Sequence, residues 1–360
     1  MRSVYVHIPF CKSICSYCDF CKFLHKEEWA NIYLDSLSKE IDEYYEGDTI
    51  KSIYIGGGTP SCLSINNINK LFSILKKIKL SNSYEMTFEC NIDDINNDLL
   101  HTLSLYGVNR LSLGIESFNK KNLEFMNRNH NKKDIKEKIK QCRIYGFENI
   151  NVDLIYALPS EKLFTLKRDL NNILKLGVEH ISTYSLIIEE HTMLSYNKVK
   201  PIEEELDYAM YKYICNKLAK KGFHHYEVSN FSKTGYESVH NLTYWNNEEY
   251  YGFGLGAHGY INDIRYENTR NFNKYIKGEY RFDELMVSFQ EEMENELILG
   301  LRKLDGISIS NFNRKYNRDI FKVFKIEDAL KKKYLRLKGD MLYIPENKIY
   351  VMNEIINMIM

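Results

Sequence analysis

The sequence lacks a net charge, a long hydrophobic run and any low-complexity linker. Its 49 Lys and Arg residues balance 49 Asp and Glu residues, which excludes a protein whose main task is to coat nucleic acid or an anionic membrane. No apolar run reaches the roughly 18–20 residues that a membrane-spanning helix needs. The N-terminal stretch MRSVYVHIPFCKSIC has no apolar core followed by small residues, as a secretion signal has. We therefore expect a cytoplasmic protein that binds no nucleic acid.

The first half of the chain alternates short β-rich runs with longer amphipathic stretches. Its 360 residues, 44% of them hydrophobic, are enough to bury one large core and a smaller one. Successive β-then-α units predict an α/β fold with a parallel sheet and right-handed crossovers, although this rhythm does not separate an open sheet from a barrel. The six expected strands are Val4–Ile8, Ser52–Ile55, Glu85–Glu89, Arg110–Ile115, Asn151–Tyr156 and His180–Ser185.

The second half of the chain does not continue the alternation of strand and helix patterns. An expected helix that ends near Lys221 is followed by a stretch rich in aromatic residues and glycine. From about Ser288 the sequence is basic and has a helical pattern. A hairpin over Leu335–Ile344, turning on Gly339 and Asp340, is typical of a small winged-helix-like α+β module. We therefore expect an N-terminal domain over 1–195, a connecting region over 196–287 and a C-terminal domain over 288–360.

Four of the eight cysteines fall within eleven residues, at Cys11, Cys15, Cys18 and Cys21. In a reducing compartment such a cluster indicates a metal site or redox chemistry rather than disulfides. Three thiolates on one loop suit either zinc or an iron–sulfur cluster, but no second ligand pair for a zinc site follows downstream. The remaining cysteines, which we expect to be small buried hydrophobes without a function, are Cys62, Cys90, Cys142 and Cys215.

A glycine-rich turn follows the second expected strand, in Gly56-Gly57-Gly58-Thr59-Pro60. Glycines allow positive φ and a close approach of ligand to backbone, so exposed N–H and C=O groups here could hold a zwitterionic amino acid. The turn reads neither GxGxxG nor GxxxxGK, which disfavours dinucleotide and P-loop chemistry. Parallel strands bring this turn and the cysteine loop to the same end of the sheet.

The segment from Tyr5 to Phe20, with its Cys-x3-Cys-x2-Cys spacing, resembles the start of a radical S-adenosylmethionine (SAM) enzyme. More narrowly, it resembles the group that contains oxygen-independent coproporphyrinogen III oxidases and the HemW haem chaperones. This resemblance implies a partial (β/α)6 barrel with a smaller C-terminal domain. It also implies a [4Fe–4S] cluster on Cys11, Cys15 and Cys18, with SAM on the iron that has no protein ligand.

The same resemblance implies a set of SAM-binding residues, because the GGGTP turn and several later motifs follow in the family's order. The residues implied are Tyr5, Tyr17, Gly57, Gly58, Thr59, Glu89, Glu116, Arg128 and Asp153. A carboxylate such as Asp153 suits ribose hydroxyls, and Arg128 suits a carboxylate. At position 116 the family usually has Gln, so Glu116 here replaces a neutral donor and acceptor with a charged acceptor.

The segment His240-Asn241-Leu242-Thr243-Tyr244-Trp245 resembles a motif associated with haem binding in the chaperones. Imidazole is a common axial ligand of haem iron, so the resemblance implies a haem ligand at His240. A His beside aromatic residues is also commonly a hydrogen-bonded core residue, and His258 is a second candidate with a more structural character.

The resemblance leaves a chaperone and a decarboxylating enzyme as alternatives. The oxidases carry a further Cys two residues after the third, where this chain has Phe20, and they have a longer segment before the cluster than the ten residues found here. These differences favour a chaperone that binds haem and passes it to acceptor haemoproteins, including respiratory proteins at the membrane, without a need for radical turnover. A homodimer is compatible with this reading, and a zinc-stabilised scaffold is the third alternative.

Overall fold

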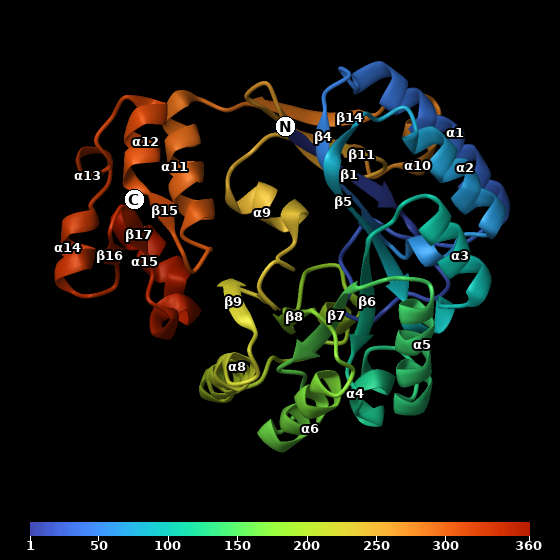
Figure 1. Ribbon diagram of the computed structural model, residues 1–360, viewed down its shortest axis with the longest axis horizontal. Coiled ribbons are helices and arrows are strands. Elements are labelled where there is room, and N and C mark those ends of the chain that lie inside the picture. The colour runs from blue at the N-terminus through green and yellow to red at the C-terminus, as the bar shows by residue number, and fades with distance from the viewer.

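The computed structural model describes residues 1–360 and contains one sheet of twelve strands (Figure 1). The strands follow in the order β14-β13-β12-β11-β1-β4-β5-β6-β7-β8-β10-β9. The six central strands are parallel to one another. They are β1 (Arg2–Ile8), β4 (Ile50–Gly57), β5 (Leu80–Asn91), β6 (Arg110–Glu116), β7 (Asn149–Tyr156) and β8 (His180–Ser185). The predicted parallel sheet is thereby confirmed.

Helices that connect these strands cover the outside of the sheet (Figure 1). They are α1 (Glu27–Tyr44), α2 (Ile65–Leu75), α3 (Asn97–Leu105), α4 (Lys120–Phe125), α5 (Lys132–Ile144) and α6 (Leu163–Leu174). In α6 one apolar face packs into the core, since Leu166, Leu170 and Ile173 are fully buried. The short helix α3 was not anticipated from periodicity; it begins where the side chain of Asn96 accepts a hydrogen bond from the Leu99 N–H.

The region expected as a connection, 196–287, adds strands to both edges of this sheet. On one edge β10 (Asn230–Ser232) pairs antiparallel with β8, and β9 (His224–Glu227) pairs with β10. On the other edge β11 (Tyr250–Phe253) lies parallel to β1, followed by antiparallel β12 (His258–Ile261), β13 (Ile264–Asn268) and β14 (Arg281–Met286). The helices of this part of the chain are α7 (Met193–Tyr196), α8 (Glu204–Ala219), α9 (Val239–Trp245) and α10 (Phe272–Ile276).

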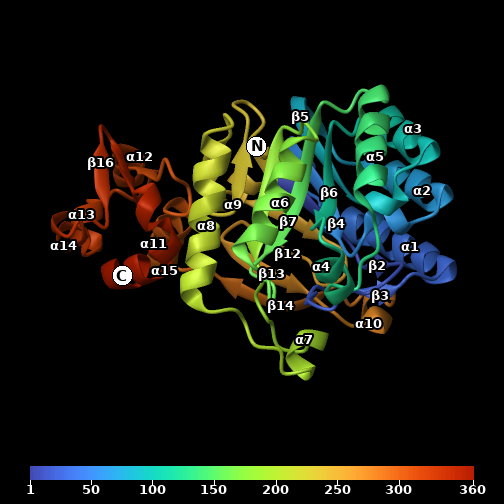
Figure 2. The same ribbon diagram turned by 90° about the horizontal axis from the view of Figure 1, so that it is seen from below.

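The C-terminal part is a smaller α+β unit at the side of the barrel, and α8 lies between the two in Figure 2. Its first helix, α11 (Phe289–Gly300), begins with a capping box between Ser288 and Glu291. The remaining elements are β15 (Ile307–Ser308), α12 (Ile309–Tyr316), α13 (Ile320–Val323), α14 (Ile326–Lys331), β16 (Arg336–Lys338), β17 (Met341–Tyr343), the 3₁₀ helix η3 (Glu346–Val351) and α15 (Met352–Ile359). The β16–β17 pair confirms the predicted hairpin. No helix has the length and apolar character that crossing a bilayer requires.

Candidate functional site

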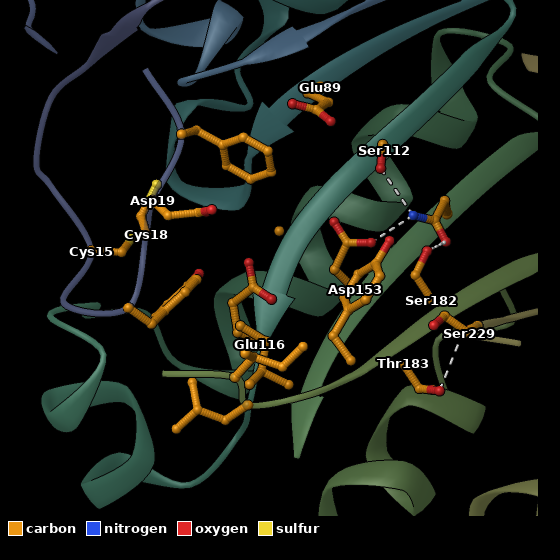
Figure 3. A pocket seen from close by; sticks show the side chains of 18 of the residues that line it. Cys15, Cys18, Asp19, Glu89, Ser112, Glu116, Asp153, Ser182, Thr183 and Ser229 are labelled. Carbon is orange, nitrogen blue, oxygen red and sulfur yellow. Dashed lines mark hydrogen bonds between the residues drawn. The ribbon is translucent and has the colours of Figure 1, made fainter. Parts of the chain in front are cut away.

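A cavity of about 1000 Å³ opens at the C-terminal ends of the parallel strands. Figure 3 shows the cysteine loop on one side of it, Ser182, Thr183 and Ser229 on the other, and Glu116 and Asp153 between them. The structure brings most of the predicted site residues to this cavity, namely Cys11, Cys15, Tyr17, Cys18, Gly57, Gly58, Thr59, Glu89, Glu116, Arg128 and Asp153. Tyr5 and His240 are not among the residues that line it.

The cysteine loop is closed at its base by two short parallel strands, β2 (Phe10–Cys11) and β3 (Phe23–Leu24). The Phe23 N–H donates to the Pro9 carbonyl oxygen at 2.6 Å, which fixes both ends of the loop. Thr59 of the glycine turn donates its hydroxyl to the Cys11 sulfur at 3.5 Å, so the turn and the loop are in contact. Burial raises the pKa of the Cys11 thiol to about 11. A cation beside this thiol would favour its deprotonated form.

Cys21 lies apart from the other three cysteines of the loop. Its thiol donates to the Arg270 carbonyl oxygen at 3.9 Å and does not line the cavity. A Cβ added to Gly256 would come within 2.9 Å of the Cys21 Cβ, so the side chain is packed against the β11–β12 connection. The loop therefore presents three thiols to the cavity and turns the fourth away.

The glycine turn has no room for side chains. Gly57 has a φ of +112°, and a Cβ there would lie 2.5 Å from the His7 ring; one on Gly58 would lie 2.7 Å from the Phe10 carbonyl oxygen. The N–H groups of Gly58 and Thr59 donate to the carbonyl oxygens of Ile8 and Phe10, at 2.9 and 2.7 Å. The expectation that these N–H groups are exposed to a ligand is therefore wrong, because they hold the turn against the base of the cysteine loop.

Two of the predicted carboxylates share a crowded wall of the cavity. Glu89 accepts hydrogen bonds from the Tyr54 hydroxyl at 2.7 Å and from the Gly57 N–H at 3.1 Å. Burial raises the pKa of Glu89 to about 7, and the neighbouring charge of Asp153 adds to the rise. Burial also raises the pKa of Asp153, whose Oδ1 accepts from the Asn151 amide at 2.8 Å. A cationic ligand group beside Glu89 and Asp153 would therefore stabilise the ionised forms of both side chains.

Glu116 and Arg128 form an ion pair at 3.0 Å, with 7% and 15% of their side chains exposed. Arg128 also donates to Asn91 Oδ1 at 2.9 Å and to the Gly114 carbonyl oxygen at 3.2 Å, while its Nε is buried without a partner. Glu116 has a φ of +63°, at the irregularity that ends β6. A non-glycine residue in this region costs about 1 kcal/mol or more, which the ion pair helps to offset.

The haem-ligand prediction concerned His240, which lies in α9 rather than in the cavity. Only 1% of it is exposed, and its ring nitrogens pair with Ser52 Oγ at 3.0 Å and with the Tyr244 hydroxyl at 2.8 Å. Burial lowers its pKa to about 3. The second candidate, His258, is exposed on β12, 3.7 Å from Glu267. In this structure His240 therefore has the contacts of a core residue.

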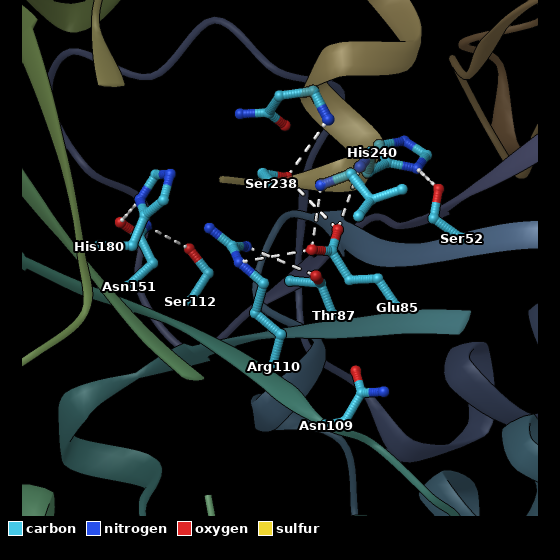
Figure 4. A network of polar contacts seen from close by, with 12 residues as sticks. Ser52, Glu85, Thr87, Asn109, Arg110, Ser112, Asn151, His180, Ser238 and His240 are labelled. Atoms are coloured by element: carbon cyan, nitrogen blue, oxygen red, sulfur yellow. Dashed lines mark hydrogen bonds and ion pairs between the residues drawn. The ribbon is translucent and has the colours of Figure 1, made fainter. Parts of the chain in front are cut away.

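A polar network fills the interior of the barrel below the cavity (Figure 4). Glu85 accepts from the N–H groups of Val239 and His240, each at 3.1 Å, and so caps the N-terminus of α9. Arg110, which is 2% exposed, lies between Glu85 and the cavity, with its Nε 4.0 Å from the carboxylate. Sequence reasoning missed Arg110 because it lies at the start of β6, away from the strand ends that carry the other site residues.

Sequence reasoning also missed the far wall of the cavity. This wall comes from the end of β8, from α8, from the β9–β10 connection and from η3 and the start of α15, which are separated in the sequence and carry no shared motif. Its residues include Tyr184, Tyr211, Val228, Ile349, Tyr350 and Met352. Tyr211 and Tyr350 pack with ring centroids 5.6 Å apart, so the C-terminal unit completes the site. The end of β8 could have been found by the same strand-end rule that located the other residues.

Two family models match this chain. The radical SAM superfamily matches residues 5–173, and the HemN C-terminal domain matches residues 287–348. Among solved structures, the chain is similar to coproporphyrinogen III oxidase (HemN) from Escherichia coli, with a TM-score of 0.86 and 21% identity. That comparison covers 98% of this chain and 88% of the oxidase chain, and it shows the fold.

Curated relatives are more similar in sequence. The heme chaperone HemW of Lactococcus lactis is 39% identical over 344 residues, which cover 93% of this chain and 90% of that protein. The heme chaperone HemW of Bacillus subtilis is 38% identical over 375 residues, which cover 99% of this chain and 98% of that protein. The likeness therefore extends over the barrel, the region 196–287 and the C-terminal unit together.

Proposed function

Because this chain belongs to the heme chaperone HemW family of the radical SAM superfamily, we propose that it binds haem and transfers it to acceptor haemoproteins. The observation that carries this proposal is the 38–39% identity to heme chaperones over 93–99% of the chain. In this proposal a [4Fe–4S] cluster and SAM are bound in the cavity, and membrane-associated respiratory proteins are among the acceptors. A homodimer is part of the same proposal.

The three cavity-facing thiols fit a multi-iron cluster. Cys11, Cys15 and Cys18 all line the cavity, whereas the fourth thiol of the loop, Cys21, contacts the Arg270 carbonyl oxygen outside it. Thiolates are the usual protein ligands of a four-iron cluster, and three of them leave one iron without a protein ligand. Together, the bound cluster and SAM supply one-electron redox chemistry.

The residues around the cysteine loop suit SAM, which carries a sulfonium, an ammonium and a carboxylate. Glu89 and Asp153 offer negative charge whose pKa values are raised by burial, so a bound cation would stabilise their ionised forms. Arg128, with its unpartnered Nε, suits the SAM carboxylate. Gly57 and Gly58 contribute by keeping side chains out of the space beside the thiols, and Thr59 contributes its hydroxyl contact with the Cys11 sulfur.

The size and the far wall of the cavity suit a porphyrin. Ligand sites usually enclose roughly 300–1000 Å³, so a cavity of about 1000 Å³ has room for more than one ligand. Tyr184, Tyr211 and Tyr350 present aromatic surface with polar tips to this space. Such side chains can pack against an apolar macrocycle and donate to its carboxylates.

His240 can ligate haem iron only if one ring nitrogen gives up its present partner. Since Nε2 is bonded to Tyr244 on the next turn of α9, Tyr244→Phe would free that nitrogen. We expect the Soret band of the haem complex to shift in His240→Ala and to persist in Tyr244→Phe, with His258→Ala as the control. If all three variants give the parent spectrum, His240 is not the ligand.

The chaperone activity is tested by incubating haem-loaded protein with an apo-haemoprotein and following the acceptor's spectrum. We expect transfer from the haem-loaded protein with a reconstituted cluster to be faster than transfer from the same haem-loaded protein without the cluster. The anaerobic assay with coproporphyrinogen, SAM and a reductant tests the alternative. Formation of protoporphyrinogen in that assay would overturn the proposal in favour of the oxidase reaction.

A further inference from the structure

A second group of metal-ligating side chains lies where the barrel meets the C-terminal unit. Cys215 comes from α8, His225 from β9 and Glu346 from the start of η3. One donor atom of each lies within 4.8 Å of the donor atoms of the other two. The group is separate from the cysteine loop, and Cys215 was expected to have no function. His225 and Glu346 are 121 residues apart in the sequence, so only the fold brings them together.

The histidine of this group is oriented as a metal ligand is. Its ring stacks on Phe231 at a centroid distance of 4.2 Å and an interplanar angle of 15°, and it is 5% exposed. One ring nitrogen, Nε2, lies 3.4 Å from the Val228 carbonyl oxygen, a partner that can only accept. The proton of a neutral imidazole is therefore placed on Nε2. Donation of this second N–H to a backbone carbonyl is the usual outer contact of a zinc-bound histidine.

The other nitrogen, Nδ1, then carries a lone pair toward the Glu346 carboxylate, 3.2 Å away. Two acceptors at this distance repel unless a cation lies between them, and that cation is either a proton on the ring or a metal ion. The neighbouring Cys215 favours the metal ion, because its sulfur is a further metal ligand and has no part in a proton shared between His225 and Glu346. A separation of about 3.3 Å is also the edge expected between nitrogen and oxygen ligands on one tetrahedral zinc with bonds of about 2.0–2.1 Å.

We propose that Cys215, His225 and Glu346 bind one zinc ion that joins the barrel to the C-terminal unit. One thiolate, one imidazole and one carboxylate match the mixed sulfur, nitrogen and oxygen preference of zinc. Cys215 and His225 are buried, whereas 52% of the Glu346 side chain is exposed, so the ion has a path from solvent and a water can complete the tetrahedron. Binding replaces the thiol proton, which is released to solvent.

The consequence of this site would reach the large cavity. Glu346 begins η3, which supplies Ile349 and Tyr350 to the far wall, and Met352 follows directly at the start of α15. Zinc at Glu346 would fix that wall against α8 and β9. The site therefore connects metal occupancy to the position of the C-terminal unit, independently of the cysteine loop.

The test uses the full-length chain with Cys11, Cys15 and Cys18 changed to Ser, because those thiols also bind divalent metals. After removal of metal with a chelator, the protein is titrated with Co²⁺ under reducing conditions. We expect one equivalent to bind with a near-ultraviolet sulfur-to-cobalt band, and one equivalent of Zn²⁺ to displace it. The band should disappear in Cys215→Ser and persist in Cys21→Ser and Cys142→Ser, which are matched thiol controls.

Because Cys215→Ser alters a buried side chain, the exposed Glu346→Gln provides a second variant. Because zinc binds the folded chain, we expect Zn²⁺ to raise the Tm of the parent. Glu346→Gln should weaken Co²⁺ binding at least tenfold and abolish this rise in Tm, whereas Glu354→Gln on α15 should leave both unchanged. A Co²⁺ spectrum without the sulfur band, or identical binding by the parent and both site variants, would overturn the proposal. In that case His225 and Glu346 form a simple ion pair.

Discussion

The replacement Glu116→Gln tests how the ion pair with Arg128 affects the SAM site. At 3.0 Å and with little exposure, Glu116 holds a guanidinium that we propose for the SAM carboxylate. A hydrogen bond to a charged group contributes about 1.5–3 kcal/mol; in Glu116→Gln the bond keeps the charged guanidinium but loses the charged acceptor, so it falls at the lower end of this range. The Gln amide oxygen therefore holds the guanidinium less firmly by about 1–1.5 kcal/mol.

A SAM carboxylate that takes this guanidinium must compete with Glu116. In Glu116→Gln the competition is weaker by the same amount, so we expect the variant to bind SAM about tenfold more tightly. Glu89 and Asp153 remain in place to meet the sulfonium and ammonium groups. The free energy of unfolding without ligand should fall by about 1 kcal/mol, because the buried pair loses its charge-assisted bond.

The assay is anaerobic calorimetric titration of SAM into reconstituted protein, with guanidinium unfolding of the unliganded chain beside it. Glu161→Gln is the matched control, since Glu161 is also buried and accepts from Asn122 at 3.1 Å but does not line the cavity. Equal or weaker SAM binding by Glu116→Gln would refute the reasoning. It would mean that Glu116 contacts SAM itself or that Arg128 does not bind the carboxylate.

Three further predictions concern the cysteine loop, the core histidine and the glycine turn. Cys15→Ser should lose the cluster, while Cys21→Ser should keep it because that thiol faces away; iron and sulfide per chain after reconstitution measure this. His240, whose pKa is lowered to about 3, takes up a proton on unfolding below its ordinary pKa of about 6.5. The stability it contributes is therefore present above pH 6.5 and is lost as the pH falls. Between pH 7 and pH 5 the parent should lose about 2 kcal/mol more unfolding free energy than His240→Gln, and parallel curves would contradict this. Gly57→Ala should lower Tm clearly more than Gly47→Ala, because both glycines have positive φ but only Gly57 lacks space for a Cβ.

The local features of this fold were predictable from the sequence because they depend on neighbouring residues. Strand and helix periodicity located six parallel strands, and the end of each strand located the glycine turn, Glu89 and Glu116. The hairpin at Gly339 and Asp340 was predictable for the same reason. The short helices α3 and α4 were not, because they span too few turns to show a clear period.

The contacts that join distant segments could not be predicted in this way. The expectation of exposed N–H groups at Gly58 and Thr59 was wrong because those groups donate to the end of β1 and to β2. The haem role of His240 stays a prediction, since its two ring nitrogens have partners on β4 and α9. The pairing of Glu116 with Arg128 depends on how the α4 loop returns over the end of β6.

The sequence by itself determined the chemistry that this protein can offer: three thiols at a fixed spacing, a glycine turn after a strand, and acids at strand ends. Spacing along one loop and alternation along one strand are enough to place such groups, because they depend on bond lengths and helix or strand periods. Only the tertiary structure decided which groups meet. Cys21 turns to Arg270, and Cys215, His225 and Glu346 converge from three elements. Burial and long-range packing set these contacts, and neither is readable from one segment alone.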